Sequence, residues 1–198
     1  MVSEITQSNR LTWLRIAGIC GIVGPIIAIT CTLLAITLSP WFSWTKNTLS
    51  DLGVHKTSAT LFNLCLITSG ILILVFAVGL QKVLSKHLFG NMGALILALA
   101  AISLCAIGIF TGDYGNLHLY FSVAFFALIS LSSFLVGVSM IRKHSGKIGA
   151  LITLMGFVAG VVWVFPWEGV AIPETISSLA VLIWIVLLGI RLVLEALK

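Results

Sequence analysis

Six long apolar runs, separated by short polar segments, decide the fold class of this sequence. They cover about residues 13–38, 59–81, 91–111, 118–141, 148–166 and 175–195. Each is close to the roughly 20 residues that an α-helix needs to cross the hydrocarbon core of a bilayer. A β-barrel would need short alternating segments instead, and continuous runs in lipid must be helical to satisfy their own backbone. The sequence therefore predicts an all-α bundle of six transmembrane helices.

The composition excludes an ordinary soluble domain. Of the 198 residues, 60% are hydrophobic and only 9% are charged, whereas soluble domains carry about 25% charged residues. The mean hydropathy is +1.19, so most of the surface must face lipid. We expect a single membrane domain over residues 1–198, because no polar stretch is long enough to fold separately. The four cysteines lie in apolar runs without metal-ligand spacing, and the sequence leaves their pairing open.

The basic residues predict the orientation of the chain. Nine of the 11 Lys and Arg residues lie at the chain ends or in loops on the same side, and only Lys46 and Lys56 lie on the other. The positive-inside rule then places both termini in the cytoplasm, with the protein integral to the cell membrane. A net charge of +5 could suggest nucleic-acid binding. Because the positive-inside rule already explains the basic residues, we expect no nucleic-acid partner. Four of the six acidic residues lie on the predicted outer side.

Two predicted hairpins begin with similar sequences. Residues 90–96 and 146–152 agree at five of seven positions, and each hairpin carries an acid near its outer turn. The first two spans follow the same plan. The bundle is therefore either three repeated helical hairpins or a coincidence within the small residue alphabet of apolar helices.

Short motifs near the predicted outer ends of the spans resemble one family. They are Ser-Asp-Leu-Gly at 50–53, Phe-Asn at 62–63, Phe110 and Asp113 with His118, and 168–174 with Trp184. Together they resemble a six-span, mainly archaeal membrane protein family catalogued as domain of unknown function 998. Thr111 stands where that family often has proline. The resemblance implies a topology and a set of polar positions, and it implies no activity.

The outer ends of six helices joined by short loops must lie close together, so their polar residues are expected to share one patch. These residues are Asp51, Asp113, His118 and Glu174, with His55 and Glu168 as secondary candidates. Carboxylates and imidazoles are suited to binding a divalent metal such as Zn²⁺. They could also act as acid and base on a lipid head group. Whether a metal cofactor binds stays open.

Each candidate also has a structural explanation, because acids in loops usually cap a helix or face solvent. Asp51 can close a turn before Gly53, and Glu174 follows a proline at a helix start, where the helix dipole favours an acid. His118 can hydrogen-bond a loop carbonyl, while His55 and Glu168 can simply be solvated.

Three functions fit these observations. One is a membrane-embedded protein that acts on a lipid or head group at the outer face. The second is a structural or assembly subunit of a larger membrane complex, which would add other membrane subunits to the bilayer as partners. The third is a small transporter, disfavoured because no charged residue falls at a span centre. No metalloprotease motif or nucleophile elbow decides whether the protein is an enzyme.

Overall fold

The computed structural model describes residues 2–142 and 146–197. It contains six long helices: α1 (Val2–Thr37), α2 (Lys56–Leu84), α3 (Leu88–Ile109), α4 (Asn116–Ile141), α5 (Gly146–Val161) and α6 (Ala171–Ala196). Short 3-10 helices lie in the connections: η1 (Leu49–Gly53), η2 (Gly112–Tyr114) and η3 (Val162–Val164). All six long segments are long and apolar enough to cross a membrane. The predicted all-α, six-helix transmembrane bundle is confirmed.

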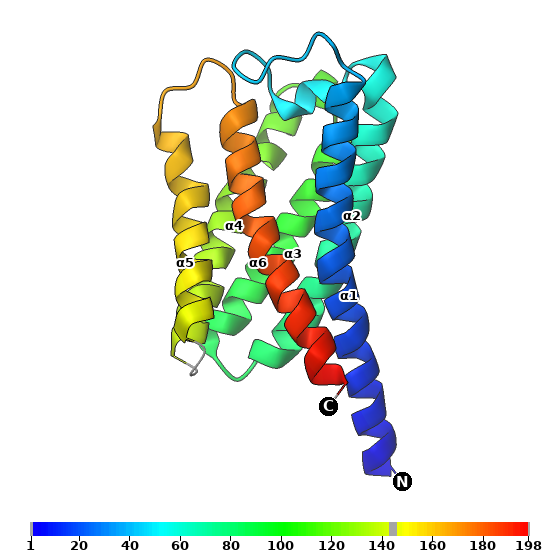
Figure 1. The fold of residues 1–198 in the computed structure, drawn as a ribbon, viewed down its shortest axis with the longest axis vertical. Coiled ribbons are helices and arrows are strands. Elements are labelled where there is room, and N and C mark those ends of the chain that lie inside the picture. The colour runs from blue at the N-terminus through cyan, green and yellow to red at the C-terminus, as the bar shows by residue number, and fades with distance from the viewer. Residues whose placement is uncertain (1, 143–145, 198) are drawn as a thin grey trace.

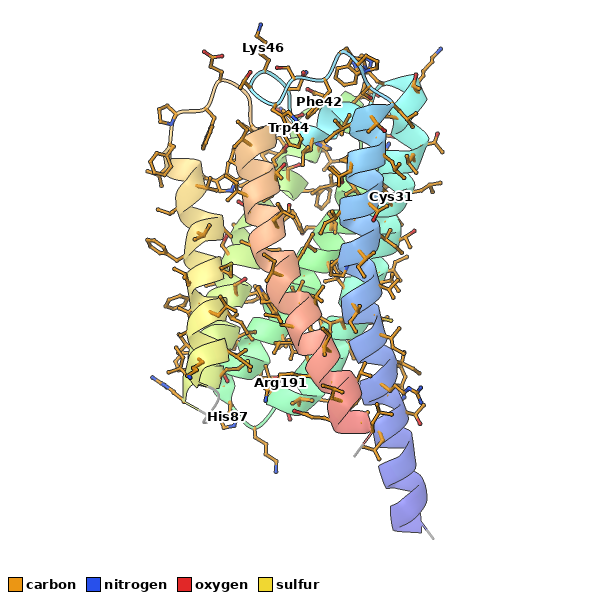
Figure 2. All side chains as sticks on the ribbon, in the orientation of Figure 1. Cys31, Phe42, Trp44, Lys46, His87 and Arg191 are labelled. Atoms are coloured by element: carbon orange, nitrogen blue, oxygen red, sulfur yellow. A yellow bond between two sulfur atoms is a disulfide. The ribbon has the colours of Figure 1, made fainter. Side chains whose placement is uncertain are left out.

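Consecutive helices are neighbours, and the bundle closes where α6 packs against α1. Figure 1 shows both chain termini, the α2–α3 connection and the adjoining ends of α4 and α5 at one end, which we call the terminal end. The α1–α2, α3–α4 and α5–α6 connections lie at the opposite end, which we call the long-loop end. Lys46 lies at the long-loop end, whereas His87 and Arg191 lie toward the terminal end (Figure 2). The connections that the positive-inside rule assigns to opposite sides of the membrane thus lie at opposite ends of the bundle.

Close contact between α1 and α6 depends on glycine. A Cβ on Gly18 would lie 2.7 Å from the carbonyl oxygen of Gly189, and a Cβ on Gly189 would lie 2.8 Å from the carbonyl oxygen of Gly18. Residues without bulk let transmembrane backbones approach this closely. From this contact the two helices diverge toward the long-loop end (Figure 1). The divergence leaves room between their long-loop halves.

Side-chain hydrogen bonds fix α6 against α4 and α5. The indole N–H of Trp184, which is fully buried, donates to Oγ of Ser133 at 2.8 Å. Trp163 donates to Oγ of Ser177 at 2.9 Å, and that hydroxyl donates to the Ala159 carbonyl at 2.8 Å. The buried indole N–H of Trp184 needs such a partner, because no water is present there to replace it. These bonds place one face of α6 toward the centre of the bundle.

A disulfide joins Cys31 of α1 to Cys65 of α2, with Cα atoms 6.2 Å apart. Thr37 and Lys56 border the loop between these helices, so both cysteines lie in the halves of their helices nearer the long-loop end. Figure 2 shows Cys31 in this part of α1. The crosslink holds the two helices together beneath the loop that joins them.

Candidate functional site

The connection between α1 and α2, residues 38–55, is the first loop, and hydrogen bonds within it shape η1. Oδ2 of Asp51 accepts from the backbone N–H of Thr48 and from Nδ2 of Asn47, both at 2.9 Å. Oγ1 of Thr48 accepts in return from the backbone N–H of Asp51 at 3.1 Å. This reciprocal capping box satisfies backbone donors that would otherwise be unpaired at the start of the turn. Asp51 therefore has a structural role in the loop.

The rest of the Ser-Asp-Leu-Gly motif fastens the first loop to α2. Leu52 is fully buried and packs in a small cluster with Phe62. Nδ2 of Asn63 donates to the Gly53 carbonyl at 2.8 Å, and Ser58 donates to the Leu52 carbonyl at 2.8 Å. Gly53 has no room for a side chain, because a Cβ there would collide with Oδ1 of Asn63. The motif thus sets the position of the loop relative to the helices.

The first loop also contacts the last loop, residues 165–170, and the start of α6. The backbone N–H of Ala171 donates to the Asn47 carbonyl at 3.0 Å. A Cβ on Gly169 would lie 2.8 Å from the Asn47 nitrogen, so the two backbones pass in direct contact. One turn further along α6, Glu174 accepts a hydrogen bond from the backbone N–H of Leu49 at 2.6 Å. The first loop is therefore held from both α2 and α6.

Glu174 is the buried acid of the predicted patch. α6 begins at Ala171, four residues before the predicted sixth span, so Glu174 lies within the first helical turn. Its side chain is only 7% exposed, and the Leu49 N–H is the donor to its carboxylate. The carboxylate also lies close enough to Asp51 for their like charges to interact. A buried carboxylate is costly unless it is paired, although the N-terminus of α6 offers some compensation.

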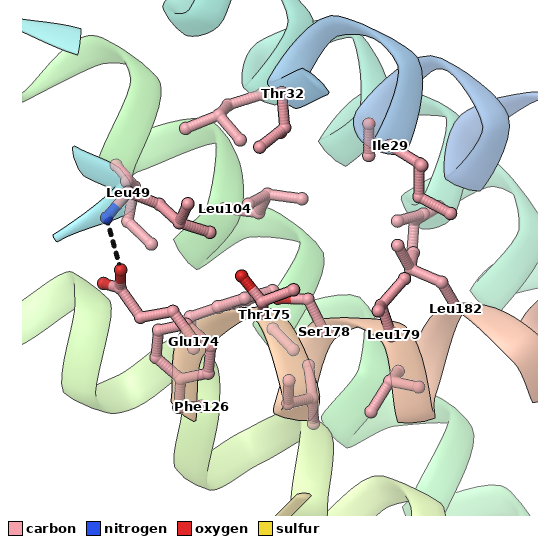
Figure 3. A pocket seen from close by; sticks show the side chains of 18 of the residues that line it. Ile29, Thr32, Leu49, Leu104, Phe126, Glu174, Thr175, Ser178, Leu179 and Leu182 are labelled. Carbon is pink, nitrogen blue, oxygen red and sulfur yellow. Dashed lines mark hydrogen bonds between the residues drawn. The ribbon is translucent and has the colours of Figure 1, made fainter. Parts of the chain in front are cut away.

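A cavity of about 250 Å³ lies beneath the first loop. Its walls come from α1, α2, α3, α4 and α6, and Trp44, Leu49 and Ser50 of the first loop cover it. Figure 3 shows Ile29 and Thr32 of α1 on one side and Ser178 of α6 on the other, with Glu174 beside Leu49 at the loop. Most lining side chains are apolar, and Glu174 is the ionisable residue among them. The cavity is thus apolar along its walls and acidic near the loop.

The exposed residues of its lining indicate that the cavity opens sideways, between α1 and α6. Three of its lining residues are well exposed: Leu33 of α1 at 53%, Trp44 of the first loop at 41% and Leu179 of α6 at 40%. They lie where α1 and α6 have diverged from their contact at Gly18 and Gly189. In a bilayer, an opening between two spanning helices faces lipid. A hydrophobic molecule could reach the cavity from the membrane without crossing the first loop.

The other predicted site residues lie away from the cavity lining. Nδ1 of His118 is 2.7 Å from the Phe110 carbonyl, and Nε2 is buried without a partner among the described residues. His55 stacks on Trp41 with ring centroids 3.8 Å apart. Asp113 and Glu168 are exposed in loops at the long-loop end.

The predicted patch therefore divides. Asp51 and Glu174 are brought together at the first loop, whereas the other four candidates make separate contacts or face outward. Within residues 2–142 and 146–197, no group of three or more His, Cys, Asp or Glu side chains is placed to hold a metal ion.

Of the described residues that line the cavity, Glu174 is the one that was among the predicted site residues. Besides Ser50 of the first loop, four hydroxyl-bearing residues of the helices line it: Thr32, Ser122, Thr175 and Ser178. All four lie in the parts of their helices near the long-loop end. Such a concentration of hydroxyl groups only weakly indicates a cavity with a polar end. Hydroxyls in membrane spans often bond only to their own helix, as Thr175 does to the Ala171 carbonyl at 2.7 Å.

Comparison with known proteins defines the family without adding an activity. No curated protein and no solved structure matches the chain. The family model described as "Protein of unknown function (DUF998)" matches residues 22–191, a range that contains the first loop, the cavity walls and Glu174. The resemblance seen in the short motifs is thereby confirmed. The chain belongs to the DUF998 family, and it is a multi-pass membrane protein with six candidate spans.

Proposed function

We propose that the protein binds a lipid or another amphiphile at the long-loop end of the bundle. The apolar chain of the ligand lies in the cavity, and its head group lies beside Glu174. The observation that carries this proposal is an apolar cavity that opens between two spanning helices and has a buried acid at its covered end. An amphiphile has the same arrangement of apolar and polar parts.

The cavity volume favours a small ligand or part of a larger one. Pockets that enclose drug-sized ligands have volumes of about 300–1,000 Å³, and this cavity has about 250 Å³. A two-chain phospholipid would not fit inside it. A single hydrocarbon chain that enters between Leu33 and Leu179 would fit, and the remainder of the molecule would stay in the surrounding lipid.

Our proposal places the long-loop end on the outer face of the cell membrane, with both termini in the cytoplasm. The excess of Lys and Arg at the terminal end supports this orientation. The disulfide between Cys31 and Cys65 supports it independently, because disulfides persist on the oxidising, extracytoplasmic side of the membrane. In this orientation the cavity opens into the outer leaflet.

Glu174 is the residue we assign to any acid–base chemistry on the head group. It is the ionisable side chain of the cavity lining, whereas the Asp51 carboxylate is engaged by Thr48 and Asn47. An assembly subunit would have no need of such a cavity. A transporter would need a second opening toward the terminal end, where α1 and α6 are in contact at Gly18 and Gly189.

Photocrosslinking in liposomes tests the proposal. The full-length protein is reconstituted with a single-chain amphiphile that carries a photoreactive group near the end of its chain, and the labelled peptides are mapped by mass spectrometry. We expect labelling of cavity residues such as Leu104 and Phe126. Labelling confined to outward-facing residues such as Leu64 and Phe157 would show that the chain stays in bulk lipid and would overturn the proposal.

A matched pair of variants sharpens this test. Ala28 lines the cavity, so Ala28→Leu adds bulk inside it and should reduce cavity labelling. Ala127 is exposed on α4, and Ala127→Leu adds the same bulk toward lipid and should leave cavity labelling unchanged. Equal labelling in both variants would count against binding in the cavity.

A further inference from the structure

We infer that the preferred ligand is a single-chain amphiphile with a cationic, ammonium-type head group, which pairs with Glu174. This inference rests on the proposed function, because it specifies the head-group chemistry of a ligand whose chain occupies the same cavity. The juxtaposition that carries it is a buried carboxylate at the polar end of a cavity in which none of the described lining residues is basic.

The hydrogen bonds of Glu174 leave part of its carboxylate unused. The Leu49 N–H donates to Oε2 at 2.6 Å, and among the described residues Oε1 has no donor. Oε1 is also not among the polar atoms that are both fully buried and unpartnered, so it remains accessible. A single backbone hydrogen bond offsets only part of the cost of burying a carboxylate. A donor brought by a ligand would complete its pairing.

The charges around this carboxylate favour a cation. The charge that acts on it most directly among the described residues is that of Asp51, which is also an acid. The two basic residues at the long-loop end, Lys46 and Lys56, are exposed and do not line the cavity. An anionic head group, such as a phosphate or a free carboxylate, would meet like charge and find no basic partner. An ammonium head would supply both the missing counter-charge and hydrogen-bond donors.

The lack of a basic side chain among the described lining residues also distinguishes this site from an ordinary phospholipid site. Recognition of a phosphate depends on arginine, lysine or a cluster of backbone N–H groups. The N–H of Leu49 faces the carboxylate instead. The small apolar cavity also favours a single-chain ligand, because it has room for one chain below the head group.

Competition binding tests this inference separately from the proposed function. The full-length protein is placed in nanodiscs of zwitterionic lipid with the photoreactive amphiphile. Unlabelled amphiphiles with one common chain and an ammonium, hydroxyl or sulfonate head then compete for labelling. The ammonium compound should compete at roughly tenfold lower concentration than the hydroxyl compound, as one charge-assisted hydrogen bond would give. The sulfonate compound should compete least.

Two variants test whether the ammonium preference comes from Glu174. Glu174→Gln keeps an acceptor for Leu49 and removes the charge, so the ammonium preference should disappear while competition by the hydroxyl compound stays within about twofold. Glu168→Gln removes an exposed acid from the same end of the bundle and should preserve the full preference. This control corrects for attraction of cations to the protein surface.

The possible results separate the two ideas. If no compound of the series competes for cavity labelling, the proposed lipid-binding function is wrong. If the compounds compete equally, or if the ammonium preference survives in Glu174→Gln, the cationic head group is wrong while binding of a chain stands. The head-group series is measured on the unaltered protein, so the inference is tested even if the Gln variant does not fold.

Discussion

The backbone N–H of Leu49 donates to Oε2 of Glu174 at 2.6 Å, between residues that are 125 positions apart in the chain. This contact joins the loop after the first span to the start of the last span. It also places the buried acid at the covered end of the cavity, where Leu49 itself is part of the lining. One side chain therefore links the first loop to α6 and supplies the carboxylate at the covered end of the cavity.

Removing the Glu174 carboxylate should loosen the first loop. In Glu174→Ala the Leu49 N–H loses its acceptor, and an unsatisfied buried donor costs about 1–3 kcal/mol. We expect a lower midpoint of thermal unfolding in detergent and faster proteolysis within residues 38–55. Glu174→Gln retains an acceptor and should lose less stability. Because Glu168 is exposed, Glu168→Ala should behave as the unaltered protein does, and an equal loss in that variant would argue against a specific role for the Leu49 contact.

Asn63 should stabilise the first loop through its hydrogen bond to the Gly53 carbonyl. Asn63→Ala removes the donor to the Gly53 carbonyl, and we expect a loss of about 1–3 kcal/mol, as for other buried hydrogen bonds that lose one partner. The change is measured as the shift in the thermal unfolding midpoint. Asn116 is exposed at the start of α4, so Asn116→Ala is the matched control. Indistinguishable midpoints for the two variants would contradict the assigned role of the motif.

The six spans could be predicted from the sequence because hydropathy is a local property. Each helix long enough to span a membrane coincides with an apolar run that can be read without knowledge of its neighbours. The sequence predicts the sixth span from about residue 175, and α6 begins four residues earlier, at Ala171. Glu174, which was expected at a helix start, lies in the first turn of that helix.

The cavity and the burial of Glu174 could not be predicted in this way, because both depend on contacts between distant segments. Burial of Glu174 requires the first loop to cross over α6, which residues 47–49 achieve through backbone contacts. The cavity requires α1 and α6 to meet at Gly18 and Gly189 and then diverge. His118 shows the converse, since the local bond to the Phe110 carbonyl was among its expected explanations.

The disulfide gives a prediction that can be checked by mass spectrometry. In protein purified without reductant, denatured and alkylated, Cys20 and Cys105 should be modified, while Cys31 and Cys65 should be protected until a reductant is added. Replacing both bonded cysteines with serine should lower stability by about 2–4 kcal/mol, the typical contribution of such a crosslink. Alkylation of all four cysteines without reductant would show that the pair is not oxidised in the native membrane.

The glycine contact between α1 and α6 should control the width of the lateral opening. A methyl group on Gly18 would lie 2.7 Å from the Gly189 carbonyl oxygen and 2.8 Å from the side chain of Val193, so Gly18→Ala must push the helices apart. Overpacking of this kind costs about 1–3 kcal/mol, and we expect a matching fall in the unfolding midpoint. Gly160→Ala is the control, because its new methyl would find its nearest neighbour at 3.7 Å.

The two glycine variants also report on the cavity. If the contact at Gly18 sets the separation of the helices, Gly18→Ala should change photolabelling at Leu33 and Leu179, the exposed lining residues of α1 and α6. Gly160→Ala should leave that labelling as it is in the unaltered protein. A loss of stability without any change in labelling would mean that the crossing supports the fold but does not determine the opening, because the long-loop halves would then be held apart by the first loop alone.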